Sequence, residues 1–144
     1  MPPAHVTAAA PEAAAALDRA YVLARTAADP ALLELLRIRV AQLLGDEKEA
    51  AVRSNGVDLD AQKVAALERW AGSERFSALE RAALELTEQF VVYVAGVTDE
   101  QTRAVLELAG PEQLYGLVHA LYAFDARVRV RLALARVLDE PAAP

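Results

Sequence analysis

Four residues of this chain have the types and spacing to perform chemistry: Glu34, Asp46, Glu49 and Arg53. If residues 46–53 are helical, Asp46, Glu49 and Arg53 lie on one face, because offsets of three and seven residues return to nearly the same direction. Glu34 belongs to the preceding helix. Crowded carboxylates raise one another's pKa, whereas a nearby guanidinium lowers it, so a cluster of this kind can hold an acid and a base together. We therefore predict a small polar site with Glu34, Asp46 and Glu49 as its catalytic candidates.

The same residues also admit a purely structural interpretation. Asp46 followed three residues later by Glu49 is close to a capping box, which would open a short helix. Glu34 would then be held by Arg37 or Arg39. Because structural ion pairs often mimic functional ones, we favour this interpretation for the residues of the second helix. For Glu34 we favour the site, because a carboxylate in an apolar surround is costly unless it is paired.

A second candidate surface lies near the end of the chain. Tyr115, His119, Tyr122 and Arg129 follow one another at steps of four, three and seven residues, so they share one stripe of a helix. Such a stripe could bind an aromatic or carboxylated small molecule. A face at a subunit contact is the favoured alternative, since Tyr and Arg are common there.

The central helix is expected over residues 30–44. Asp29 can cap its first turn, Pro30 supplies the fixed φ of a first helical position, and Gly45 ends it. Its apolar residues cover more than one face, so it should be buried on most sides.

The remaining sequence predicts an all-α chain with no sheet. Helices are expected over residues 12–28, 46–54, 60–71, 77–95, 98–110 and 111–138. Residues 127–132 alternate with period two but are flanked by helical patterns, so we predict that the last helix continues through them. We expect a loose arm over residues 1–10, a single domain over 11–140 and a tail over 141–144.

The stretch Leu33–Gly45 resembles the start of the carboxymuconolactone decarboxylase and AhpD-like alkylhydroperoxidase family. The similarity extends from residue 29 to residue 138, and the supporting segments are 64–70, 76–84 and 97–100. That family carries a glutamate, eleven intervening residues, a Cys-x-x-Cys pair, and a histidine four residues after the second cysteine. These positions fall here on Glu34, Asp46, Glu49 and Arg53. Only the glutamate is retained.

The resemblance implies an AhpD-like domain of about six to seven helices that assembles into trimers or hexamers. Thiol peroxidase chemistry is excluded, because the chain contains no cysteine. The other branch of the family implies a cofactor-free acid–base lyase, a decarboxylase or isomerase acting on a small organic acid. In that role Glu34, with a raised pKa, would donate a proton. The substrate would be bound by Arg53, Arg37, His119 and Tyr122. The alternative is a non-catalytic oligomeric binding or scaffold protein.

Composition sets the remaining limits. The 144 residues carry a net charge of −6, which argues against a nucleic-acid partner. The longest apolar run, around residues 90–97, is far shorter than the roughly 20 residues of a membrane span. With no cationic segment before the alanine-rich start, we expect a cytoplasmic protein. We expect no cofactor and no metal site, since no metal-ligand spacing stands out.

Overall fold

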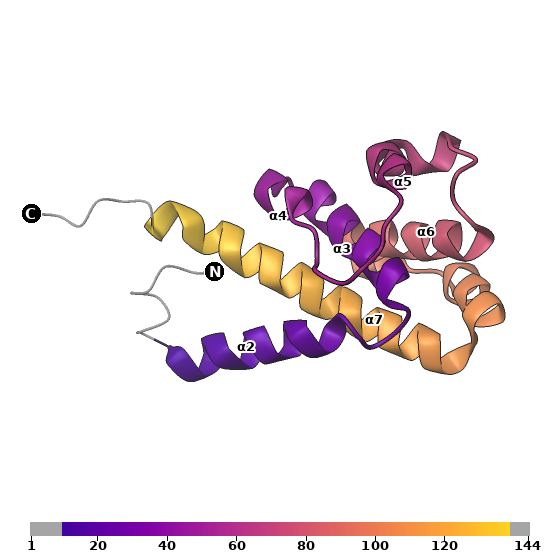
Figure 1. Ribbon diagram of the computed structural model, residues 1–144. Helices are drawn as coiled ribbons and strands as arrows, with labels where there is room; N and C mark the ends of the chain where they lie inside the picture. The colour runs from indigo at the N-terminus through magenta and orange to yellow at the C-terminus, as the bar shows by residue number, and fades with distance from the viewer. Residues whose placement is uncertain (1–9, 139–144) are drawn as a thin grey trace, which may run out of the picture.

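The structure is a computed structural model that describes residues 10–138, and the expected arm (apart from residue 10) and tail lie outside these residues. The described part contains six α-helices, two short 3-10 helices and no strand (Figure 1). The predicted all-α class and the predicted number of helices are confirmed. In chain order the elements are α2 (Pro11–Ala24), α3 (Pro30–Leu43), α4 (Glu47–Ala51), α5 (Ala61–Ala66), η1 (Leu67–Gly72), α6 (Ala78–Tyr93), η2 (Val94–Gly96) and α7 (Asp99–Leu138).

Helix α3 is the centre of the fold. It begins as predicted, with Pro30 in its first turn and the Asp29 carboxylate accepting a hydrogen bond from the Leu32 N–H at 2.9 Å. It packs against α4, α6, α7 and η1. Nine of its 14 residues are buried, among them Glu34 and Arg37. The prediction that this helix is covered on most sides is therefore confirmed.

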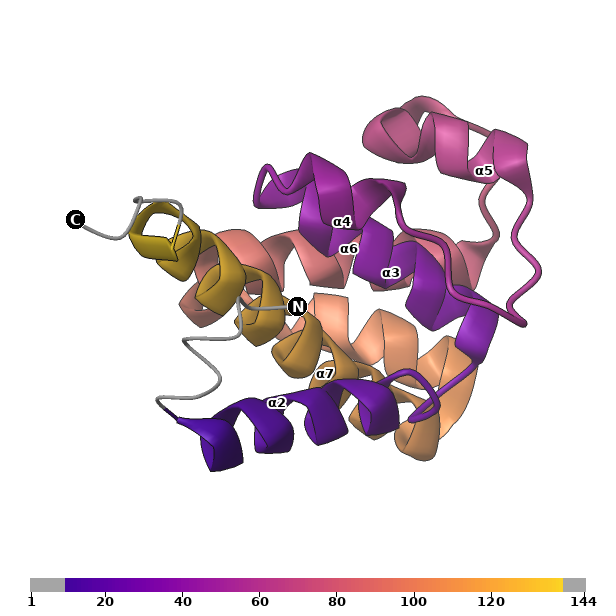
Figure 2. The same cartoon turned by 60° about the vertical axis from the view of Figure 1, so that its left-hand side comes forward.

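Helices α2 and α7 lie side by side and run in opposite directions (Figures 1 and 2). Gly116 of α7 allows a very close approach to the turn after α2. A Cβ atom at this position would lie 1.9 Å from the carbonyl oxygen of Ala27, so no other residue fits without a backbone shift. This approach fixes the end of α2 and the middle of α7 relative to each other.

Helix α7 is broken at one residue. Gly110 has φ +84° and ψ 169°, and Pro111 restarts the helix, as the two predicted segments 98–110 and 111–138 require. Residues 127–132 are helical as predicted. Helix α6 opens with the complete capping box of Ser77 and Glu80. Between residues 10 and 138, no helix combines the length and apolar character needed to cross a membrane.

Three helices are shorter than predicted. The helix expected over 12–28 ends at Ala24. The helix expected over 46–54 ends at Ala51, because Val52 adopts an extended conformation with ψ 139°. The helix expected over 60–71 is α-helical only to Ala66 and continues as the 3-10 helix η1, with a non-helical residue at Arg69. The extended segment 52–60 between them passes over one end of α3 and turns at Gly56, whose φ is +79°.

Candidate functional site

A buried arginine organises the polar interior of the fold. Arg37 is 2% exposed and uses all five of its N–H donors. Its Nε and Nη2 donate to the two carboxylate oxygens of Glu34 at 3.0 and 2.8 Å. The remaining donors go to the carbonyl oxygen and Oε1 of Glu49, both at 3.0 Å, and to the carbonyl oxygen of Val52 at 2.5 Å. No donor of Arg37 is left for a substrate, so its predicted role in substrate binding has no support in this geometry.

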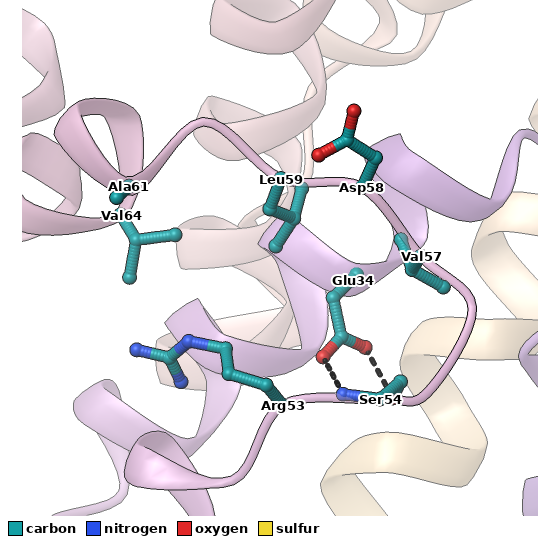
Figure 3. Close-up of a pocket in the computed structure, with 8 residues that line it drawn as sticks. All are labelled: Glu34, Arg53, Ser54, Val57, Asp58, Leu59, Ala61 and Val64. Carbon is teal, nitrogen blue, oxygen red and sulfur yellow. Dashed lines mark hydrogen bonds between the residues drawn. The ribbon is translucent and has the colours of Figure 1, made fainter.

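The carboxylate of Glu34 likewise has all of its hydrogen-bonding positions occupied. Besides the two bonds from Arg37, its carboxylate accepts from the Ser54 N–H at 2.9 Å and from the Ser54 hydroxyl at 2.8 Å (Figure 3). Burial alone would raise the pKa of Glu34, but the hydrogen bonds from Arg37 and Ser54 outweigh it and hold the pKa below its usual value. The predicted raised pKa is wrong. Glu34 is a fully bonded carboxylate that cannot donate a proton at neutral pH.

Glu34, Asp46 and Arg53 do not bond to one another, although Glu34 and Arg53 both line the cavity shown in Figure 3. The Asp46 carboxylate caps α4 by accepting from the Glu49 N–H at 3.1 Å, and it pairs with Arg131 of α7. Burial alone would raise the pKa of Asp46, but the bonds from Arg131 and the Glu49 N–H lower it. Arg53 is exposed, donates only to the carbonyl oxygens of Ala50 and Val52, and points away from Glu34 (Figure 3). The cluster fails because α4 ends at Ala51, before its next turn can bring Arg53 onto the face of Asp46.

Glu49 instead joins a residue that the sequence analysis did not select. Its Oε1 accepts from the Tyr21 hydroxyl of α2 at 3.3 Å, as well as from Arg37. No residue between 10 and 135 donates to its other oxygen, Oε2. The Arg127 guanidinium stacks on the Tyr21 ring, 3.7 Å from its centroid. Chiefly because of burial, the pKa of Tyr21 is raised, so its phenol is protonated at neutral pH. In the sequence, Tyr21 falls between Leu17 and Ala24 at helical spacing, and nothing in this local pattern marks it as part of a polar site.

Three cavities surround the segment 52–60. The first, which we call the arginine cavity, has a volume of about 660 Å³ and is lined by Tyr21 and by six charged residues. These are Asp18, Arg25, Glu49, Arg53, Arg127 and Arg131. The second, which we call the apolar cavity, has a volume of about 380 Å³ and is lined by Val22, Pro30, Leu33, Val57 and Phe124 together with Arg25, Thr26, Glu34, Asn55 and Gly56. The third, shown in Figure 3, has a volume of about 330 Å³ and includes Glu34, Arg53 and Ser54 in its lining.

The arginine cavity is positive in an acidic protein. Its lining carries four arginines and two carboxylates, a balance of +2, whereas the whole chain has a net charge of −6. Arg25 and Arg127 form no ion pair with any residue in the described range. The cavity therefore offers guanidinium groups to an anion. Within residues 10–138 no group of three His, Asp or Glu side chains is placed to hold a metal ion.

The tyrosine and histidine stripe of α7 lies elsewhere. Tyr115, His119 and Tyr122 are exposed, and none of them lines the three cavities. The rings of Tyr115 and His119 are 4.2 Å apart, and Tyr122 is 70% exposed. Arg129 pairs with Asp125 at 2.8 Å, as its i, i+4 spacing predicts. The substrate-binding role predicted for His119 and Tyr122 gains no support from this placement.

Comparison with known proteins identifies the fold. A crystal structure of a protein of unknown function from Agrobacterium tumefaciens, described as a candidate AhpD antioxidant defence protein, superposes with a TM-score of 0.78. The match covers 96% of each chain at 18% sequence identity. No protein-family profile matches the sequence, and no curated protein matches it. The chain therefore has an AhpD-like all-α fold, as the resemblance in its sequence implied, and it contains no cysteine.

Proposed function

We propose that the protein binds a small organic acid in the arginine cavity. The observation that carries this proposal is the positive lining of that cavity in a chain whose net charge is −6. Without cysteine the protein cannot use a thiolate against a hydroperoxide. The AhpD-like fold in this chain therefore serves a function other than thiol peroxidation.

Arg25 and Arg127 are the residues proposed to hold the carboxylate of the ligand. Neither has an acidic partner between residues 10 and 138, and both line the cavity. Arg127 lies with its guanidinium over the Tyr21 ring, an arrangement that leaves its N–H groups directed outward in the plane of the guanidinium. A planar guanidinium binds a carboxylate through two parallel hydrogen bonds, which an ammonium group cannot reproduce.

Calorimetric titration with acetate, succinate and citrate tests this proposal. Arg127→Gln should weaken binding of these acids by about 10-fold or more, because a hydrogen bond to a charged group contributes roughly 1.5–3 kcal/mol. Arg103→Gln is the matched control, since Arg103 is exposed, lies outside the three cavities and carries the same charge. Equal losses in both variants would show that only the overall charge matters, and the proposal would fail.

Acid–base catalysis on the bound acid is the second candidate function. The observation that favours it is the pair formed by Glu49 and Tyr21, which both line the arginine cavity. The Oε2 atom of Glu49 accepts from no residue of the described range, so it is available as a base, and the protonated Tyr21 phenol is available as an acid. This pair takes the place of Glu34, whose carboxylate is fully bonded.

Deuterium exchange tests the catalytic candidate without a known substrate. A panel of β-keto and lactone acids with an acidic C–H bond is incubated with the protein in heavy water and followed by NMR. Wild-type protein should speed exchange or loss of carbon dioxide for at least one acid, and Tyr21→Phe and Glu49→Gln should abolish the effect. If the whole panel binds but nothing is accelerated, the protein is a binding protein only.

Assembly into a homo-oligomer, a trimer or hexamer, remains part of the proposal. The exposed stripe of Tyr115, His119 and Tyr122 on α7 supports it, because large aromatic side chains are enriched at subunit contacts. Light scattering after size exclusion measures the mass directly. Tyr122→Asp should lower that mass if the stripe lies in the contact, and a monomeric wild-type protein would refute the assembly.

A further inference from the structure

The arginine cavity and the apolar cavity adjoin each other. Both are lined by Val22, Arg25 and Asn55, so these three residues stand at their boundary. Val22 and Arg25 belong to the end of α2 and the residue that follows it, and Asn55 belongs to the turn of the segment 52–60. A ligand that enters one cavity can therefore extend past these residues into the other.

The two cavities differ in chemistry. Leu33 and Phe124, each 1% exposed, contribute to the apolar cavity from the hydrophobic core, and Pro30 and Val57 add further apolar surface. Glu34 also lines this cavity, but both of its oxygens are occupied by Arg37 and Ser54, so its carboxylate has no free bonding position for a ligand. Apolar groups are thus favoured in this cavity, and anionic groups are favoured in the arginine cavity.

We infer that the ligand is an amphiphilic carboxylate, with its carboxylate bound in the arginine cavity and an aryl or short acyl group in the apolar cavity. This inference rests on the proposed function and adds the class of ligand to it. Arg25, at the boundary, is placed to contact the carboxylate end, while Val57 contacts only the apolar end. The volume of the apolar cavity, about 380 Å³, lies in the range of about 300–1,000 Å³ found for small-molecule sites.

The segment 52–60 covers both cavities and is tied down at one residue. Val52 lines the arginine cavity, Val57 lines the apolar cavity, and Ser54 between them is bonded to Glu34 through its N–H and its hydroxyl. The two compartments are therefore held in a fixed relation. An extended ligand would therefore meet the polar surface of the arginine cavity and the apolar surface of the apolar cavity at a fixed distance from each other.

A titration series tests the inference. The affinities of acetate, butanoate, hexanoate, octanoate and phenylacetate are measured by calorimetry on the full-length protein. Affinity should rise with chain length, by up to about fourfold for each CH₂ that becomes buried, and then level off when the apolar cavity is full. Phenylacetate should bind more tightly than acetate.

Val57→Asp separates the two ends of the ligand. It places a charge in the apolar cavity without touching the arginine cavity, so it should remove the gain with chain length and leave acetate binding within about twofold of wild type. Ala61→Asp is the matched control: it adds the same charge at an exposed position that lines only the third cavity. The control should retain the gain with chain length. Circular dichroism establishes that both variants fold, and Thr26→Trp, at an exposed residue of the apolar cavity, replaces Val57→Asp if the latter does not fold.

The outcomes distinguish the inference from the proposal on which it rests. If acids bind with an affinity that depends on Arg127 but not on chain length, the inference is wrong and the proposed function stands. If the gain with chain length persists in Val57→Asp, or in Thr26→Trp where that variant replaces it, the apolar group binds elsewhere and the inference is again wrong. If no acid binds to the wild-type protein, the proposed function fails and the inference fails with it.

Discussion

Replacement of Glu34 by glutamine tests the central claim about the polar interior, namely that Glu34 is a structural counter-ion of Arg37. The two side chains are 4% and 2% exposed and are joined by two hydrogen bonds. Glutamine keeps the shape of the side chain but removes the charge and replaces one acceptor oxygen with an NH₂ group. Four donor bonds now enter the Glu34 carboxylate, from Arg37 and Ser54. With glutamine, at least one N–H of a buried guanidinium loses its acceptor.

The size of the effect follows from burial. Breaking a buried ion pair from one side costs about 3–5 kcal/mol, because the other charge stays buried without its partner. Arg37 keeps its second carboxylate, Glu49, at 3.0 Å, so the lower end of that range applies and we expect a loss of about 3 kcal/mol. With a urea m value of about 2 kcal/mol/M, the unfolding midpoint falls by about 1.5 M. A domain of ordinary stability, about 5–15 kcal/mol, still folds after such a loss.

Urea unfolding followed by circular dichroism provides the assay. Glu85→Gln is the matched control, because Glu85 is an exposed residue of α6 and such changes usually alter stability by about 0.5 kcal/mol or less. If Glu34→Gln is as stable as wild type, or more stable, the buried carboxylate is not held by favourable bonds. Glu34 would then be a functional group whose burial costs the fold free energy, and not a structural counter-ion of Arg37.

Three further predictions concern the Ser54 hydroxyl, the titration of Glu34 and the close approach at Gly116. Ser54→Ala removes one hydrogen bond to Glu34 and should cost about 1 kcal/mol while speeding amide hydrogen exchange in the segment 52–60; unchanged exchange would show that the Ser54 N–H bond alone holds this segment. Because the folded-state pKa of Glu34 is lowered, its contribution is present above the unfolded pKa of about 4.3 and is lost as pH falls through the folded pKa. The stabilities of wild type and Glu34→Gln, measured by urea unfolding from pH 7 to pH 3, should therefore begin to converge as the pH falls below the unfolded pKa of about 4.3. A constant gap over this range would contradict the lowered pKa of Glu34. Gly116→Ala forces a Cβ against the Ala27 carbonyl oxygen and should lower the free energy of unfolding by at least about 1–3 kcal/mol, measured by thermal unfolding. In the control Gly72→Ala, the added Cβ meets no atom within 4 Å, so no such loss is expected.

The side chains around Glu34 bond to one another, so the groups proposed to contact a ligand lie beside them, in the arginine cavity. Residues 34, 37 and 54 satisfy one another, so they position the segment 52–60 and do not act on a ligand. Tyr21, Arg25, Arg127 and Glu49, whose Oε2 accepts from no residue between 10 and 135, line the arginine cavity next to this cluster. The Glu34–Arg37 pair thus supports the segment that lines the proposed binding site.

Local sequence signals predicted the elements of the fold well. The cap at Asp29, the capping box at Ser77 and the break at Gly110 all act within a few residues, and the structure has each of them. The helical assignment of residues 127–132 also held, because the flanking period of 3.6 outweighs a short alternation. The helix ends were less well predicted. The end of α4 at Ala51 and the change to a 3-10 helix at Leu67 have no capping glycine or proline to mark them.

The sequence by itself determined that this chain is all-α, that α3 is its buried centre, and that thiol chemistry is closed to it, because periodicity, capping residues and composition are local properties. It also singled out Glu34 as a buried carboxylate in need of a partner. Only the tertiary structure decided which arginine pairs with Glu34, and that Glu49 turns toward Tyr21. It also decided that Arg25 and Arg127 line a cavity without acidic partners among residues 10–138. The contacts of Glu49 with Tyr21 and of Asp46 with Arg131 span 28 and 85 positions of the chain. Arg39, the other possible partner of Glu34, binds Glu88 instead, 49 positions further along the chain. Which side chains meet at such separations depends on how the helices pack, and no local pattern encodes that.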